Sequence, residues 1–569
     1  RHPVFDLTMK EVALLFVVVL LAYVQSATTS SETIWVKEVT TRFQTDKRTP
    51  SDVDLPDHLT FRFSRGSDAL TLNLERNHDI NPNTDTYFVQ KVKNGRLQIV
   101  KSRNFEKENV AYYQDRENGA SMTVRCVKRS VKPCDRVING NIRMGDRRYE
   151  LRPAEGSVTS RNLFEVQGVL DKPYVLQDKS NIRSEKSVEY KDVASVDVKN
   201  VEEERKDLLQ RLHGQIITQS SRNIDDTGAT SVKTRFLKKR YYVNVAVLVD
   251  SSIWDIYAST IRSTNILKKK DKVKRKIREA YSHIMNSVNL LYKGIEDNSI
   301  TITVTLSAFI FFQHAALFPH SASIVEMING TTRIAAYPYH ADLFNWDLQY
   351  GVNIQIPFNH AMLFTRHDLY RDSFADDDLF GLSYLYGICI PGKRTSLIQT
   401  DDYDITVNTA AHELGHNLGA YHDGDDDAKD CNPLDLFIMT PDYVRNHPSM
   451  NYTKNPYLFS KCSEKSFKKT LKYKDCVNKK GKVYNETEWK EHVSKTPGEV
   501  YSPNEQCHLI NGPNSVYCGT VPADICHLMR CTDPTNRKCG PRYYKAATGT
   551  ECGNNRWCIE GRCVSKSSK

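Results

Sequence analysis

Residues 412–423 read His-Glu-Leu-Gly-His-Asn-Leu-Gly-Ala-Tyr-His-Asp, and this stretch decides how the chain is interpreted. The apolar residues before and within it favour a helix, on which His412 and His416 lie one turn apart and share a face. Gly419 can end that helix, because glycine adopts a left-handed turn at little cost. The turn allows His422 to return to the same point. Three imidazoles predict a zinc site whose fourth position stays open to water, as in catalytic sites.

Glu413 follows the first histidine and is not expected to bind the metal. We expect its carboxylate to take a proton from the attacking water and to pass that proton to the leaving nitrogen of a peptide bond. Zinc lowers the pKa of its bound water to about 7, so one carboxylate suffices as the base near neutral pH. The alternative, three histidines packed in a core without a metal, would leave costly unpaired polar groups.

The composition is that of a globular protein. The chain has 569 residues, 39% of them hydrophobic, and a net charge of +10. This length predicts roughly three or four domains. The densest basic stretch, residues 268–276, is interpreted as the solvated start of a helix in preference to a polyanion site. Glycosaminoglycan or matrix partners stay possible, whereas no nucleic-acid module accompanies the charge.

Several features predict export from the cell. Residues 9–26 have the pattern of a signal peptide, and their apolar run over residues 12–24 is shorter than the about 20 residues that span a bilayer. No later segment reaches that length, so no membrane span is expected. The even cysteine count fits disulfides formed in an oxidising compartment. Three glycosylation acceptors agree with secretion: Asn329, Asn451 and Asn485.

The order of local patterns predicts the domain organisation. After the signal peptide, residues 27–240 alternate β-like runs with charged loops and form a propeptide that ends at a basic processing site, Arg240. A buried strand at 241–250, a helix at 272–292 and a strand at 299–306 then open an α/β catalytic domain. The catalytic domain is expected over 241–478. A spacer at 479–500 and a cysteine-rich module at 501–569 follow.

The spacing His412-Glu-x-x-His416-x-x-Gly419-x-x-His422 is the metzincin motif, and Asp423 after it resembles the adamalysin (reprolysin) branch of secreted metalloproteases. This resemblance implies a mixed sheet with a zinc-binding helix. It also implies that Met439 is a hydrophobic floor beneath the metal. The branch pattern pairs Cys389 with Cys476 and Cys431 with Cys462, although four cysteines by themselves allow three pairings.

Two positions depart from the family pattern. Many relatives hold a structural calcium with a glutamate and an aspartate, where this chain has Asn244 and Asn359. Because calcium prefers anionic oxygens, losing both carboxylates should weaken or abolish that site. Residues 111–153 resemble the adamalysin-type prodomain, but its late zinc-blocking cysteine is missing. Cys126 and Cys134 are expected to form a disulfide, so that latency rests on steric cover of the cleft.

The C-terminal segment holds eight cysteines between Cys507 and Cys563. Such density is typical of a small disulfide-stapled module. It resembles the disintegrin-like module of the thrombospondin-motif branch, while a zinc ribbon fits less well because matched CxxC pairs are absent. The module could supply an exosite for protein substrates or simply stabilise the enzyme. The overall architecture is most similar to the short metalloproteases of tick saliva.

Three functions are compatible with these patterns. The first is a secreted endopeptidase acting on matrix, clotting or host-defence proteins. The second is a catalytically weak binding or adhesion protein that acts through the cysteine-rich module. The third is a structural or storage zinc protein, which would need four protein ligands where the motif offers three. The presence of Glu413 favours the first.

Overall fold

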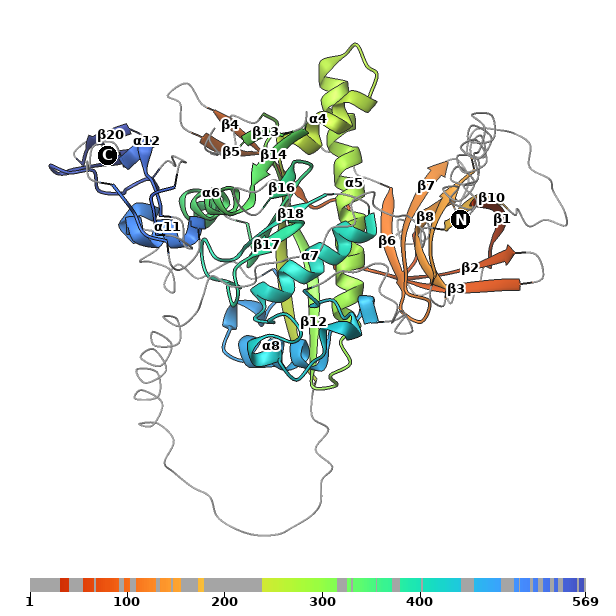
Figure 1. The fold of residues 1–569 in the computed structure, drawn as a ribbon. Helices are drawn as coiled ribbons and strands as arrows, with labels where there is room; N and C mark the ends of the chain where they lie inside the picture. The colour runs from red at the N-terminus through yellow and green to blue at the C-terminus, as the bar shows by residue number, and fades with distance from the viewer. Residues whose placement is uncertain are drawn as a thin grey trace, which may run out of the picture. The chain divides into compact units, whose positions relative to one another are not determined.

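The computed structural model (Figure 1) separates the chain into two compact units, residues 1–77 with 109–187 and residues 78–108 with 188–569. The predicted signal peptide and the three glycosylation acceptors lie outside the described residues. The structure describes residues 31–39, 55–65, 68–91, 97–102, 109–128, 134–144, 147–154, 172–178, 238–314, 325–328, 331–354, 356–370, 379–400, 403–441, 455–481, 496–500, 502–511, 515–519, 525–532, 537–540, 546–559 and 562–566.

The first unit is a closed antiparallel barrel, which agrees with the expected β-rich N-terminal region. Buried and half-exposed residues alternate along the strand Asp135–Met144, because successive side chains point to opposite faces. A disulfide joins Cys126 to Cys134. The strands, in barrel order, are β1 (Ser31–Glu38), β10 (Lys172–Asp178), β9 (Arg147–Pro153), β8 (Asp135–Met144), β7 (Ala120–Lys128), β6 (Val110–Asp115), β3 (Asp68–Arg76) and β2 (His58–Arg65).

A mixed sheet is the centre of the second unit. Its four central strands (Lys239–Val249, Ile300–Phe311, His360–Thr365 and Thr395–Gln399) are parallel and almost fully buried, as expected for strands covered on both faces. The edge strand β17 runs antiparallel to β18. The sheet order is β17 (Gly381–Ser383), β18 (Thr395–Gln399), β15 (His360–Thr365), β11 (Lys239–Val249), β12 (Ile300–Phe311), β4 (Asp85–Lys91) and β5 (Leu97–Lys101).

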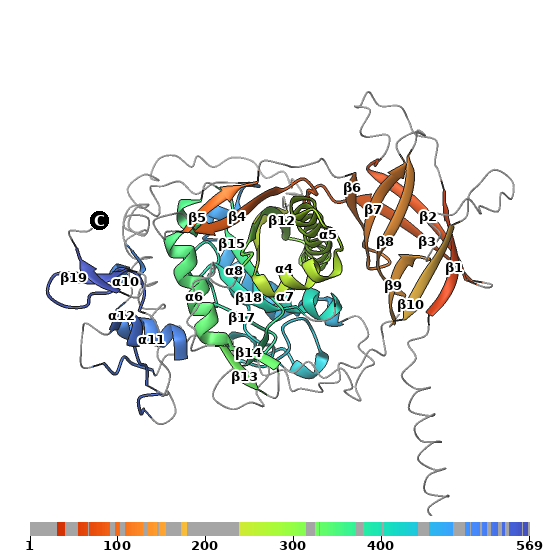
Figure 2. The same ribbon diagram turned by 90° about the horizontal axis from the view of Figure 1, so that it is seen from above.

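Helices cover both faces of this sheet (Figure 2). Helix α6 (Ala336–Gln349) packs on one face, where Trp346 shares a core with Ala246 and Leu248. Helices α5 (Ile266–Lys293) and α7 (Tyr403–Asn417) pack together on the other face. Further elements are α4 (Ser251–Thr260), α8 (Lys461–Leu471), the small sheet β13 (Val325–Ile328), β14 (Thr331–Ala335) and β16 (Asp368–Tyr370), and the 3-10 turns Gly351–Asn353, Asp426–Ala428, Pro433–Asp435, Asn455–Tyr457 and Asp475–Val477.

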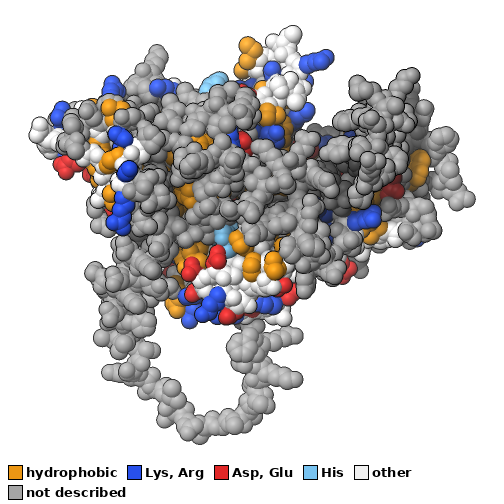
Figure 3. Space-filling model, in the orientation of Figure 1, with side chains coloured by type: hydrophobic (Ala, Val, Ile, Leu, Met, Phe, Trp, Pro, Cys, Tyr) orange, Lys and Arg blue, Asp and Glu red, His pale blue; other side chains and the backbone are white. Residues whose placement is uncertain are grey.

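Helix α5 starts before the predicted residue 272, because Asn265 accepts a hydrogen bond from the Lys268 N–H over 2.9 Å. Most of the basic stretch is exposed, as expected of a solvated helix start, but Lys274 is buried and pairs with Asp271. Around α8, at the bottom of Figure 3, lysines are mixed with acidic side chains.

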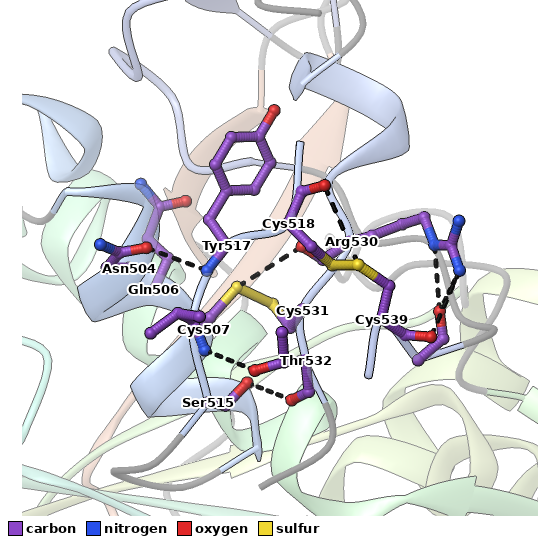
Figure 4. Close-up of a disulfide and its surroundings, with 12 residues drawn as sticks. Asn504, Gln506, Cys507, Ser515, Tyr517, Cys518, Arg530, Cys531, Thr532 and Cys539 are labelled. Carbon is purple, nitrogen blue, oxygen red and sulfur yellow. Dashed lines mark hydrogen bonds between the residues drawn. A yellow bond between two sulfur atoms is a disulfide. The ribbon is translucent and has the colours of Figure 1, made fainter. Parts of the chain in front are cut away.

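The cysteine-rich module packs against α6 through α11 (Pro503–Asn511), and its half-cystines join the same core. Figure 4 shows two disulfides of this module, Cys507–Cys531 and Cys518–Cys539. The other two are Cys526–Cys558 and Cys552–Cys563. Its remaining elements are α10 (Pro497–Val500), α12 (Ile525–Leu528), β19 (Arg556–Ile559) and β20 (Arg562–Ser565). Within the described residues, none of the helices is long and apolar enough to cross a bilayer.

Candidate zinc centre

The three predicted histidines converge on one point. The Nε2 atom of His422 lies 3.2 Å from Nε2 of His412 and 3.2 Å from Nε2 of His416. All three side chains are buried. His412 and His416 come from α7, and His422 comes from the segment after it, so the helix and the following turn build the site together.

The hydrogen bonds of the Nδ1 atoms determine which ring nitrogen of each histidine has a free lone pair. His412 Nδ1 lies 2.6 Å from the Ile438 carbonyl, and His416 Nδ1 lies 2.8 Å from the Ala420 carbonyl. A carbonyl only accepts, so both Nδ1 atoms carry the proton and both Nε2 atoms are left as acceptors. His422 Nδ1 likewise faces an acceptor, the Asp425 carboxylate at 3.7 Å. A cation satisfies three converging lone pairs, whereas a single proton does not, so these residues fit zinc.

Gly419 directs the chain back toward the metal point. Its φ of +97° is in the left-handed region, and its N–H donates to the His416 carbonyl over 2.8 Å. A Cβ here would lie 2.2 Å from Thr470 Oγ1 and 2.6 Å from the Tyr386 ring. The predicted helix stop therefore requires glycine for both its conformation and its space.

Met439 lies directly beneath the zinc helix. Its side chain is buried, and its sulfur would be 2.5 Å from a Cβ on Gly415, the helix residue just before His416. Its carbonyl accepts from the Asp423 N–H over 2.9 Å. The methionine turn thus fixes the segment that carries His422.

Asp423 links the third histidine to helix α8. Its Oδ1 accepts from Ser460 Oγ over 2.6 Å, and Ser460 also caps α8 through the Ser463 N–H. Burial raises the pKa of Asp423 to about 6, while the Ser460 hydrogen bond opposes that rise.

The side chain of Glu413 lies in a narrow space between the backbone of its own helix, α7, and the edge strand β17. The side chain is fully buried, and its Oε1 would lie 2.4 Å from a Cβ on Gly381 of β17. Glycine at this position allows the carboxylate to approach the strand. Tyr292 of α5 holds the helix from behind, donating from its hydroxyl to the Ala411 carbonyl over 2.8 Å.

Comparisons with known proteins agree with this geometry. Residues 242–480 match the model of the reprolysin (M12B) family zinc metalloproteases, and residues 497–564 match ADAMTS cysteine-rich domain 2. Residues 242–480 belong to the reprolysin family. The expected architecture, with a reprolysin domain between a β-rich region and a disulfide-rich module, is confirmed.

Three relatives illustrate the similarity. "A disintegrin and metalloproteinase with thrombospondin motifs 12" of Mus musculus is 30% identical over 223 residues, 37% of this chain and 13% of that protein. The human "A disintegrin and metalloproteinase with thrombospondin motifs 7" is 31% identical over 215 residues, which are 37% of this chain and 12% of that protein. The human "A disintegrin and metalloproteinase with thrombospondin motifs 20" is 32% identical over 221 residues, which are 37% of this chain and 11% of that protein. The chain thus covers a small part of these relatives' length. They are mammalian, so the expected closeness to tick proteins stays a prediction.

The reprolysin domain contains the disulfides that the resemblance implied, Cys389–Cys476 and Cys431–Cys462. A second cluster of metal-ligating residue types, Cys526, Cys552 and Cys563, has its sulfurs engaged in disulfides. That cluster is therefore structural.

At Asn244 and Asn359, where calcium binding was expected to be weakened or lost, the structure has hydrogen bonds between protein groups. The Asn244 Oδ1 accepts from Thr305 Oγ1 over 2.7 Å and from the Gly481 N–H over 3.0 Å. The Asn359 Nδ2 donates to the Cys476 carbonyl over 3.3 Å, and its Oδ1 accepts from the Asn244 N–H over 2.8 Å. These amides tie the end of the domain to β11 directly.

The predicted processing residue Arg240 lies inside strand β11, which begins before the residues that match the reprolysin family. Its side chain is exposed, and its backbone pairs in register with Thr301 of β12. A convertase would have to unpair the first residues of β11 before cutting after Arg240. Cleavage there stays a prediction.

Sequence reasoning missed one buried cluster that orients the zinc helix. Asn417 follows the second ligand, and its Nδ2 donates to the carbonyls of Lys393 (2.8 Å) and Tyr384 (3.0 Å). His360 donates from Nδ1 to Asn417 Oδ1 over 2.9 Å and approaches Ser396 Oγ at 3.0 Å. Burial lowers the pKa of His360 to about 3. The one signal in the sequence was a polar residue on the inward face of an apolar helix.

Proposed function

We propose that the chain is a secreted zinc endopeptidase, made as a zymogen, that hydrolyses peptide bonds of extracellular proteins. The observation that carries this proposal is the convergence of three histidines, in which Nε2 of His422 lies 3.2 Å from Nε2 of His412 and 3.2 Å from Nε2 of His416. Glu413 lies on the same helix, α7, as His412 and His416. The relatives are named as metalloproteinases, which supports the same activity. Matrix, clotting and host-defence proteins are the proposed substrates.

His412, His416 and His422 would hold the zinc ion. When bound, zinc would act as a Lewis acid that polarises the scissile carbonyl and lowers the pKa of its bound water to about 7. Glu413 accepts the proton of the attacking water and then delivers it to the leaving nitrogen. The burial of its carboxylate keeps bulk water away from this transfer.

The edge strand β17 supports binding of an extended peptide. It is the last strand of the sheet, pairs with β18 on one side, and Gly381 within it contacts Glu413. An extended substrate that adds to the other side of β17 brings its peptide bond beside the carboxylate. Such binding uses hydrogen bonds to main-chain groups, so it suits protein substrates of varied sequence.

We propose that the propeptide keeps the precursor inactive by sterically covering the active-site cleft. Cys126 and Cys134 are joined in a disulfide, so neither offers a thiolate to the zinc. A Cys126→Ser/Cys134→Ser precursor should stay latent until it is processed. A double variant that is active without processing would overturn this part of the proposal.

Cleavage of gelatin and fibrinogen by the processed protein tests the activity. Cutting should be lost on treatment with a zinc chelator and return when zinc is restored, because the three histidines are the proposed ligands. If the protein binds zinc and cuts nothing, the alternative of a binding or adhesion protein acting through the cysteine-rich module replaces this proposal. Glycosaminoglycan binding is an additional proposal that salt-dependent retention on immobilised heparin would test.

A further inference from the structure

A piece of the predicted propeptide is part of the catalytic sheet. Residues 78–91 and 97–102, called the strap here, lie in the same compact unit as the reprolysin domain, whereas the residues on either side of this segment belong to the barrel. Strand β4 of the strap adds in parallel to β12, and β5 adds to β4 (Figure 2). The reprolysin sheet therefore has two strands that come from residues far before Arg240.

The backbone of the strap satisfies the free edge of β12. Asp85 to Phe88 pair in register with Ala308 to Phe311. Ahead of this ladder, the Leu306 N–H donates to the Asp79 carbonyl over 3.3 Å. Without the strap these N–H and C=O groups would form an unprotected sheet edge, which proteins usually cover.

A buried arginine anchors the strap to helix α5. Arg278 is 1% exposed, and its guanidinium donates to the Thr84 carbonyl over 2.7 Å, to the Pro82 carbonyl and to Thr86 Oγ1. All three of these acceptors belong to the strap. Removing them would leave a buried cation without these hydrogen bonds, which is strongly unfavourable.

Apolar and charged contacts extend this attachment. Phe88 packs with its ring centroid 5.5 Å from Phe311 and 6.1 Å from Trp254, and Val89 is buried in the core of the sheet. At the start of the strap, Asp79 pairs with Lys293 at 3.2 Å and with Lys480 at 3.0 Å. The strap thus contacts α4, α5, β12 and the end of the reprolysin domain.

We propose that the edge of β12 together with Arg278 is a peptide-binding surface that retains the strap after the propeptide is cut from the catalytic domain. The processed protein is then a two-chain complex held by strand addition. The strap lies at the end of the sheet opposite β17, which contacts Glu413. Retention of the strap is therefore compatible with an open zinc centre.

The test uses the full chain with a site for a sequence-specific protease inserted between Thr234 and Arg235, so that cutting does not depend on Arg240. After cutting, native size-exclusion chromatography with intact-mass detection should find both fragments in one peak. Separation of the wild-type fragments under native conditions would overturn the proposal.

Two matched variants show whether the strap is the anchor. Val89→Asp puts a charge at a buried position of β4, whereas Gln90→Asp puts the same charge on the adjacent exposed position. After cutting, the Val89→Asp fragments should separate and the Gln90→Asp fragments should stay together. Equal retention of both would overturn the proposal, because other contacts would then be holding the fragments.

Hydrogen exchange of the intact complex gives a readout that does not require separation. In cut wild-type protein the amides of residues 308–311 should stay as protected as in the uncut chain. In cut Val89→Asp protein those of these amides that face β4 should exchange faster, while the amides that face β11 and the helix α7 amides stay protected. Fast exchange at residues 308–311 in the cut wild type would contradict retention.

Discussion

Gly381 of strand β17 and Glu413 of helix α7 are in such close contact that a Cβ on Gly381 would lie 2.4 Å from Glu413 Oε1. This contact sets the distance between the edge strand, where a peptide is proposed to bind, and the carboxylate that is proposed to move its protons. Neither residue is a zinc ligand. The position of the base is thus decided by the sheet as well as by the helix.

Gly381→Ala should displace the carboxylate without removing a zinc ligand. We expect peptide cleavage to fall by about 10²-fold, since a displacement on the order of 1 Å at a catalytic group has effects of this size. Zinc content should be unchanged. Gly294→Ala, at the end of helix α5 with an ordinary φ of −74°, is the control and should keep activity. Full activity in Gly381→Ala would show that the close contact does not position the base.

Asn417→Ala should loosen the zinc helix from the sheet. The substitution removes donors to two buried carbonyls and the acceptor of His360, and leaving such groups unsatisfied costs about 1–3 kcal/mol. The midpoint of thermal unfolding should drop, and zinc should dissociate faster. Unchanged stability and unchanged zinc affinity would contradict a role for this cluster in holding α7.

Calcium should not stabilise the wild-type protein. The oxygens of Asn244 and Asn359 already accept hydrogen bonds, and the Cys476 carbonyl faces the Asn359 amide. A calcium-selective chelator, with zinc kept saturating, should leave the thermal midpoint unchanged. Asn244→Glu/Asn359→Asp should be less stable and should regain stability on addition of calcium, because carboxylates are the ligands that calcium prefers. A wild-type midpoint that depends on calcium would contradict this account.

Three buried histidines predict loss of stability in acid. Burial lowers the pKa of His283 and of His340 to about 4, and that of His360 to about 3. The unfolded chain binds protons at these residues near pH 6.5, whereas the folded protein does not until the pH is far lower. The free energy of unfolding should therefore fall as the pH drops below 6.5, by about 1.4 kcal/mol per pH unit for each histidine, down to its folded pKa.

Thermal unfolding between pH 7.5 and pH 5 measures that slope. His283→Gln should flatten it by the share of one histidine, and comparing the variant with the wild type cancels any contribution from the zinc ligands. His283 stacks on Tyr403 with centroids 5.0 Å apart, so the variant is also expected to be somewhat less stable at neutral pH. An identical slope in both proteins would rule out the protonation of His283 as a cause.

The parts of the site that depend on local spacing could be predicted from sequence. His412 and His416 are four residues apart and therefore share a face in any α-helix. Gly419 marks the turn that brings His422 back. The strand and helix that open the catalytic domain were likewise visible in their periodicity. Here local pattern and tertiary structure agree.

The strap could not be predicted, because its pairing joins residues far apart in the chain. Thr86 pairs with Phe309, and no local periodicity encodes that register. Arg278 illustrates the same limit. It follows a basic stretch that is largely exposed, yet it is buried because the strap supplies its acceptors. The Asn417–His360 cluster was missed for the same reason.

The role of Glu413 as the base is tested by comparing Glu413→Gln with the wild type for zinc content and peptide cleavage in the same preparations. Glutamine keeps the size of the side chain against Gly381 but cannot accept the proton. We expect equal zinc content and a loss of cleavage of about 10²–10⁴-fold, the range for removal of a general base. A Glu413→Gln protein that keeps its zinc and cuts peptides at the wild-type rate would contradict the account.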